Sequence, residues 1–213
     1  MGVGTPEELA LPVAARVRAL LPAGTPVVVG LDGRSGSGKS TMALAVASLL
    51  AEDGTSTVVV EGDDFYAGGS ARTWDRRSPS ERAAQVIDWR RQRPVLAALR
   101  SGEAASWRPF DWEDDRWDGD ELPLGEAPVE VRPADVVVLE GAYSCRPELH
   151  DLLDLRVLLD VPPEVRRAQL LGREGDGFRT AWEVRWSSAE DHYFSLTMPP
   201  ASFDLIVGPA PGA

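Results

Sequence analysis

The stretch that decides the fold runs from residue 27 to residue 41 and reads VVVGLDGRSGSGKST. Residues 27–31 form a short apolar run rich in valine, which is typical of a strand buried in a parallel sheet. Residues 33–40 fit the pattern G-x-x-x-x-G-K-[ST], and residues 41–51 read as the helix that follows. A strand, a glycine-rich loop and a helix in this order predict a phosphate-binding loop.

The residue types in this loop indicate how it would hold a nucleotide. Glycines let successive backbone N–H groups surround a phosphate, and the helix N-terminus adds its partial positive charge. Lys39 would bridge the β- and γ-phosphates of ATP, and the Ser40 hydroxyl would ligate Mg²⁺. Arginine supplies every other basic residue in the chain, so a lysine at this position indicates that a compact ammonium is needed. The expected cofactor contacts are Gly33, Ser35, Gly36, Ser37, Gly38, Lys39, Ser40 and Thr41.

Further strand patterns predict the rest of the core. They occur at residues 57–61, 135–140, 155–160 and 203–207, with helical segments between the later ones, and an amphipathic helix is expected over residues 6–21. This alternation predicts an α/β fold, a doubly wound parallel sheet of about five strands in a single domain over residues 1–213. Residues 64–133 read as an inserted acceptor-binding region with a helix over residues 82–100, and residues 162–180 as an arginine lid.

Composition excludes several classes of function. The net charge of −12 disfavours binding to nucleic acid, so no nucleic-acid partner is expected. The lone Cys145 excludes an internal disulfide and a cysteine zinc cluster, and we expect it to be a small buried hydrophobe. Apolar runs are too short to cross a membrane, and the N-terminus lacks a signal-peptide pattern. We expect a cytoplasmic protein without membrane contact, and a homo-oligomer stays an open alternative.

Carboxylates follow two of the expected strands. Asp63, after the second strand, would face the phosphate loop and take a proton from an attacking hydroxyl, although an acidic turn that caps the next helix is the alternative. Glu140 closes a buried apolar run, where an acid is costly unless it meets a cation, so we expect it to bind Mg²⁺ through water.

Two further segments indicate the acceptor side. Arg166 and Arg173 belong to an arginine-rich stretch that would bring positive charge to a transferring phosphoryl group. Tryptophans and aspartates interleave in the inserted region. Rings for stacking and carboxylates for hydroxyls would suit a nucleoside, although most of these rings would build a local core instead.

With these residues in view, the chain resembles the uridine kinase family of P-loop kinases, which includes relatives acting on phosphoribulose and pantothenate. The resemblance rests on GRSGSGKST, GDDFY, WRPFDW, RPADVVVLEG and an R-R-x-x-L-L-x-R helix, and it extends over residues 27–207. It implies transfer of the γ-phosphate of ATP to a 5′-hydroxyl. In this sequence it implies Asp63 as the base, Glu140 as the Mg²⁺-associated acid, and Arg166 and Arg173 as lid arginines, with Gln169 in place of a third.

The resemblance also implies an acceptor site, with departures. Asp88 is the candidate for the aspartate that holds the ribose hydroxyls, although the family's F-D-H-P signature is absent in that form. Phe110 replaces a tyrosine of the family's P-x-Y-D segment. The expected acceptor contacts are Asp88, Tyr66, Phe110, Asp111 and Trp112.

Two alternatives remain open on the sequence. Arg90, Arg91, Arg93 and Arg108 could recognise an anionic acceptor, which would make the protein a kinase for a sugar phosphate, a pantothenate-like acid or an antibiotic. An NTP-hydrolysing switch is the second alternative. The chain contains no asparagine, so the N-K-x-D signature of regulatory GTPases is absent.

Overall fold

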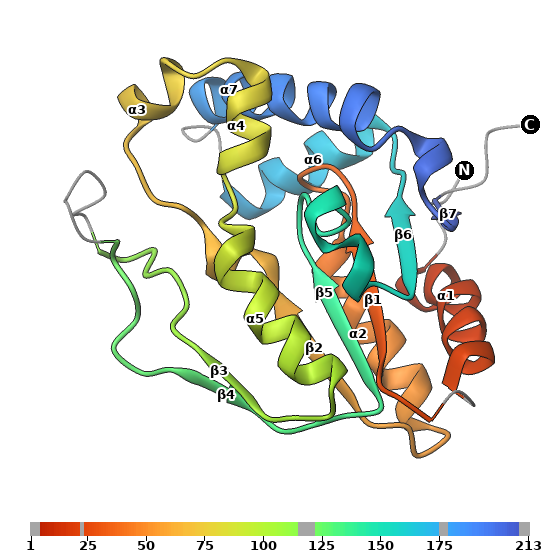
Figure 1. Ribbon diagram of the computed structural model, residues 1–213. Coiled ribbons are helices and arrows are strands. Elements are labelled where there is room, and N and C mark those ends of the chain that lie inside the picture. The colour runs from red at the N-terminus through yellow and green to blue at the C-terminus, as the bar shows by residue number, and fades with distance from the viewer. Residues whose placement is uncertain (1–4, 22–23, 115–121, 175–178, 209–213) are drawn as a thin grey trace, which may run out of the picture.

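Figure 1 shows the computed structural model of the protein, which describes residues 5–21, 24–114, 122–174 and 179–208. The described strands form a five-stranded parallel sheet in the order β2-β5-β1-β6-β7 and a two-stranded antiparallel sheet. The five parallel strands are β1 (Val27–Asp32), β2 (Thr57–Glu61), β5 (Val136–Glu140), β6 (Leu155–Leu159) and β7 (Leu205–Val207). This arrangement confirms the predicted fold class and strand positions.

Alternating residues of the central strand β1 face two different cores. Val27, Val29 and Leu31 pack with buried residues of the helices α1 (Pro6–Leu20) and α2 (Lys39–Ala51). Val28 points the other way, into a second core that includes the helix α5 (Trp89–Arg100). Figure 1 shows α1 and α2 on one side of the sheet and α5 on the other. Side chains that alternate between two apolar layers explain why β1 reads as a continuous hydrophobic run.

The register brings the carboxyl ends of three strands to one edge. Glu140 at the end of β5 lies opposite Leu31 of β1 and opposite Glu61 of β2. Each of these strands is followed by a loop or a short helix, including the 3-10 helix η2 (Gly62–Phe65) after β2. The loops after β1, β2 and β5 therefore lie beside one another, as the position of ligands in open parallel sheets requires.

The predicted helix over residues 82–100 is wrong in extent, because the chain forms two helices there. The helix α4 (Pro79–Gln85) begins at a capping box between Ser78 and Glu81, and α5 begins after Asp88. Between them Ile87 forms an antiparallel bridge with Tyr66. A helical pattern along the sequence does not reveal this pairing with a distant segment, and the pairing needs an extended backbone at Ile87.

The remaining elements frame the site. The short helix α3 (Ala71–Asp75) precedes α4, and β3 (Ala105–Trp107) pairs with β4 (Val129–Val131). The 3-10 helix η3 (Pro147–Leu152) follows β5, and η5 (Tyr193–Thr197) and η6 (Pro200–Ser202) precede β7. The helices α6 (Pro163–Glu174) and α7 (Arg179–His192) follow β6, and α7 lies along α4 (Figure 1). Within the described residues, no helix is both long enough and apolar enough to span a membrane.

Candidate active site

A cavity of about 270 Å³ lies at the carboxyl edge of the sheet. It joins the phosphate loop to the ends of β2 and β5 and to α6, and it brings together the predicted Lys39, Ser40, Asp63 and Glu140. Its lining residues are Ser35, Gly36, Gly38, Lys39, Ser40, Thr41, Asp63, Glu140, Gly141, Ala142, Gln169 and Leu170. Sequence segments as far apart as Ser35 and Leu170 therefore meet where the loop pattern and the carboxylates predicted a site.

The phosphate loop has the backbone shape that its glycines allow. Gly36 and Gly38 have φ angles of +74° and +88°, in the left-handed region that favours glycine. Gly38 is the N-cap of α2 and offers no side chain to bond the first N–H groups of that helix. These N–H groups point out of the helix end and suit an anion.

Two glycines allow the acidic loops after β2 and β5 to touch. A Cβ placed on Gly62 would lie 2.8 Å from the Glu140 carbonyl oxygen, and one on Gly141 would lie 3.1 Å from the Gly62 Cα. Any larger residue would force these loops apart. The close approach holds Asp63, the residue after Gly62, near the end of β5.

Glu140 is the most perturbed acid of the cavity. Its residue is only 6 % exposed, and burial raises the pKa of its carboxyl from 4.5 to about 7. Lys39 and the hydrogen-bonded Ser40 oppose this rise in pKa, whereas Asp63 and Glu61 add to it. Lys39 itself donates from Nζ to the carbonyl oxygen of Arg34 at 3.1 Å. A carboxyl held in this way would gain from a nearby cation.

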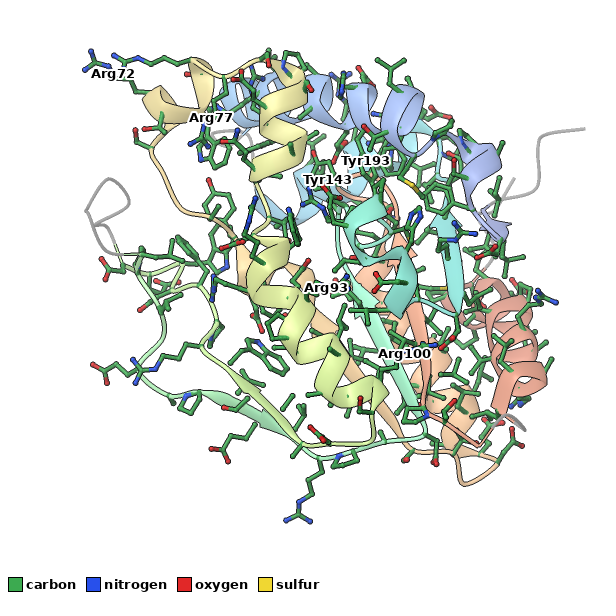
Figure 2. All side chains as sticks on the ribbon, in the orientation of Figure 1. Arg72, Arg77, Arg93, Arg100, Tyr143 and Tyr193 are labelled. Carbon is green, nitrogen blue, oxygen red and sulfur yellow. The ribbon has the colours of Figure 1, made fainter. Side chains whose placement is uncertain are left out.

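Asp32 is a buried residue that the sequence reasoning missed. Its carboxylate accepts hydrogen bonds from the backbone N–H groups of Gly33 (2.8 Å), Tyr143 (2.9 Å) and Cys145 (3.0 Å), and from the Tyr193 hydroxyl (2.8 Å). Burial, the largest cause, raises its pKa. Figure 2 labels Tyr143 and Tyr193, whose rings lie edge to face beneath α7. Asp32 closes the buried strand β1, the same signal that singled out Glu140.

Two positions of the predicted lid, Arg166 and Gln169, lie beside the phosphate loop. Arg166 donates from Nε to the Val161 carbonyl (3.1 Å) and from a terminal nitrogen to the Ser35 carbonyl (3.2 Å), so it braces the phosphate loop from outside the cavity lining. Gln169 lines the cavity, and its Oε1 lies 3.7 Å from the position of a Cβ on Gly38. The side chain of Arg173 lies outside the described residues.

Three of the predicted acceptor contacts form one aromatic cluster. The Tyr66 ring lies 4.9 Å from both Phe110 and Trp112, and Phe110 lies 4.8 Å from Trp112, measured between ring centroids. Tyr66 and Phe110 are buried, whereas Trp112 is 41 % exposed. The rings serve the core of the inserted region, and their contact with an acceptor stays a prediction.

The two predicted acceptor aspartates make local backbone contacts. Asp88 is the N-cap of α5, and its Oδ1 accepts the N–H of Arg90 at 3.1 Å. Asp111 accepts the N–H of Glu113 at 3.0 Å. Neither aspartate lines the cavity at the phosphate loop. Each caps a turn in this structure, and a role in binding an acceptor hydroxyl stays a prediction.

Two of the four predicted anion-binding arginines, Arg91 and Arg93, bond to other groups of the protein. Arg93 forms an ion pair with both oxygens of Asp151, at 2.8 Å and 2.5 Å. Arg91 donates to the carbonyl of Arg108 at 2.6 Å and lies over the ring of Phe65. These contacts stabilise the inserted region. The Asp151 carboxylate neutralises Arg93, whereas Arg91 bonds to carbonyl oxygens and keeps its positive charge.

A parallel sheet in this strand order, a phosphate loop after β1 and carboxylates at the ends of the neighbouring strands define a P-loop kinase that acts on a small molecule. Residues 28–177 match the Phosphoribulokinase / Uridine kinase family, and the chain belongs to that family. It is therefore an ATP-dependent small-molecule kinase.

Individual relatives agree with this assignment. A uridine kinase of Leuconostoc citreum is 28% identical over 200 residues, which cover 88% of this chain and 89% of the relative. A solved structure described as a possible uridine kinase from Bacillus stearothermophilus shares the fold with a TM-score of 0.64 at 22% identity, covering 92% of this chain and 98% of the other. D-glycerate 3-kinase from Cryptococcus neoformans has a TM-score of 0.61 at 17% identity, and 85% of each chain is covered. Fold similarity therefore extends to kinases named for different acceptors.

Proposed function

We propose that the protein transfers the γ-phosphate of ATP to the 5′-hydroxyl of a pyrimidine nucleoside. One observation carries the phosphoryl-transfer part of the proposal: Lys39, Ser40, Asp63 and Glu140 line a single cavity. The uridine kinases among the relatives support the choice of acceptor. The lone buried Cys145 suits a cytoplasmic protein.

The loop would bind the phosphates of ATP. N–H groups at the start of α2 would donate to the phosphate oxygens, and Lys39 would turn from the Arg34 carbonyl to the β- and γ-phosphates. Together these groups would fix the phosphoryl group for in-line attack, so that catalysis comes mostly from positioning and charge.

The donor set near the loop fits Mg²⁺. Ser40 and Glu140 provide a hydroxyl and a carboxylate that already contact each other, and Mg²⁺ binds through one or two such oxygens together with phosphates and water. Bound Mg²⁺ would neutralise charge on the phosphate oxygens. Burial raises the pKa of Glu140, and a bound cation would lower it as Lys39 already does.

Asp63 would accept the proton of the acceptor hydroxyl. It lies in η2 after β2 and lines the cavity together with Lys39. A base must lie within hydrogen-bond reach of the attacking hydroxyl, so the acceptor would enter between η2 and the phosphate loop.

Charge at this entrance favours an uncharged acceptor over an anionic one. Burial raises the pKa of Glu61, and the charges of Asp64 and Asp63 raise it further, so three acids lie close together after β2. Arg93, one of the four arginines that could offset them, is already paired with Asp151. A nucleoside fits this charge better than a sugar phosphate or an organic acid.

The decisive measurement is ADP release from Mg·ATP, with and without a panel of nucleosides, pantothenate, glycerate and sugar phosphates. We expect uridine or cytidine to stimulate release, and Asp63→Asn to lower that turnover by about 10²-fold or more, the usual scale for a lost general base. Asp64→Asn is the matched control, because it removes one charge from the neighbouring residue, whose carboxylate accepts the Trp107 indole N–H at 2.7 Å.

Each outcome separates the alternatives. If only an anionic acceptor stimulates release, the nucleoside assignment is wrong and the phosphate chemistry stands. Release that is rapid without any acceptor would favour an NTP-hydrolysing switch. Equal turnover of Asp63→Asn and wild type would remove Asp63 from the mechanism.

A further inference from the structure

The side chain of Glu190 in α7 forms hydrogen bonds with the phosphate loop. Its residue is 3 % exposed, and its Oε1 accepts two hydrogen bonds from Ser35, one from the backbone N–H at 2.7 Å and one from the hydroxyl at 2.6 Å. Ser35 belongs to the loop and lines the cavity. A buried carboxylate thus holds both polar hydrogens of a residue in the nucleotide-binding loop.

The third polar group of Ser35 is held as well. Arg166 of α6 donates to the Ser35 carbonyl at 3.2 Å. Arg34, the preceding loop residue, pairs with Asp191 at 2.6 Å and lies 3.9 Å from the other oxygen of Glu190. Helices α6 and α7 therefore fix this part of the loop from two directions.

The opposite part of α7 is anchored to the acceptor side. Arg185 pairs with Asp75 at the end of α3, at 2.7 Å and 3.2 Å. Arg82 of α4 donates to the Arg185 carbonyl (2.6 Å) and to the Ser188 hydroxyl (3.0 Å). The helix that holds Ser35 is thus attached to α3 and α4, so the loop keeps a fixed position relative to the inserted region.

We propose that Glu190 is a positioning residue for the nucleotide, which acts by holding Ser35 so that the phosphate loop is ordered before ATP binds. A glycine-rich loop has many conformations, and a ligand that must order it binds more weakly. The proposal rests on the proposed function only in that a nucleotide occupies the loop.

The test compares nucleotide affinity in three variants. We expect Glu190→Ala to weaken Mg·ATP binding by about 10-fold or more in calorimetric titration, since it removes two hydrogen bonds to a charged acceptor. Glu190→Gln keeps a side-chain oxygen that can accept both bonds, so we expect binding within about 3-fold of wild type. Asp191→Ala removes the ion pair with Arg34 but leaves both hydrogen bonds of Ser35 in place, so its loss of affinity should be clearly smaller than that of Glu190→Ala.

A double-mutant cycle with Ser35→Ala identifies the contact itself. Ser35→Ala removes one of the two bonds, so the loss caused by Glu190→Ala should be smaller in the Ser35→Ala background than in wild type. Thermal unfolding of every variant checks that the protein is folded at the titration temperature.

Three results would overturn the proposal: Glu190→Ala binding Mg·ATP like wild type, Asp191→Ala weakening it equally, or Gln failing to restore it. Because the titration needs no acceptor, it stays informative even if no acceptor on the panel stimulates ADP release.

Discussion

Glu140 makes the stability of the ligand-free protein depend on pH. Burial raises the pKa of its carboxyl from 4.5 to about 7, so between these pH values the folded protein holds a proton that the unfolded chain has lost. The stability that Glu140 contributes is complete below about pH 4.5 and is lost as the pH rises through 7. At about 1.4 kcal/mol for each unit of pKa, the loss is about 3 kcal/mol.

Glu140→Gln removes this titration and keeps a polar side chain beside Ser40. Relative to wild type, the free energy of unfolding of the variant should increase by about 3 kcal/mol between pH 4.5 and pH 8.5. In a chain of this size the corresponding change in the Tm difference is roughly 6 to 12 °C. Acids that do not interact with Glu140 contribute equally to both proteins and cancel in the difference, whereas Asp63 and Glu61, which interact with it, add a smaller change.

The assay is urea unfolding in EDTA without nucleotide, at several pH values from about 3 to 8.5. Glu81→Gln is a control of opposite sign, because hydrogen bonds from Ser78 lower the pKa of Glu81. The stability that Glu81 contributes is lost as the pH falls below about 4.5, so its difference from wild type should change only at the acid end. A difference curve for Glu140→Gln that stays flat from pH 4.5 to pH 8.5 would refute the burial argument.

Two further substitutions test how the site is assembled. Gly62→Ala places a Cβ 2.8 Å from the Glu140 carbonyl, so kcat/KM with the best acceptor should fall by about 10-fold or more. Gly172→Ala is the control, because a Cβ there meets nothing within 4 Å. Equal activities of the two variants would contradict the prediction. Arg146→Met removes a buried guanidinium that bonds the Ile87 carbonyl at 3.1 Å between α4 and α5, and urea unfolding should show a loss of about 2 to 4 kcal/mol. An unchanged unfolding midpoint would show that this junction does not need the arginine.

The sequence was sufficient for the parts of the site that local patterns and sheet geometry determine. The phosphate loop depends on consecutive residues, and Asp63 and Glu140 follow strands whose carboxyl ends must share an edge. Asp32 could have been found by the same rule, since it also closes a buried strand.

Other features depend on contacts between distant segments. The helix break at Ile87 comes from its bridge to Tyr66, and the Ser35–Glu190 contact joins residues 155 positions apart. No periodicity or motif marks either pair. The acceptor contacts stay ambiguous for another reason, because rings such as Tyr66 and Phe110 pack a core with the same residue types that stack on a base.

The anchors of the phosphate loop suggest why this fold accommodates different acceptors. Asp32 holds Gly33 at the start of the loop, Glu190 holds Ser35 in its middle, and α2 fixes its end. All three anchors lie outside the inserted region, so residues of that region other than Asp75 and Arg82, which bond to α7, can change without disturbing the groups that would bind phosphate. Acceptor identity should therefore depend on the inserted region. The exposed Trp112 lies in the aromatic cluster of this region, and a substitution there should alter acceptor choice while leaving nucleotide affinity intact.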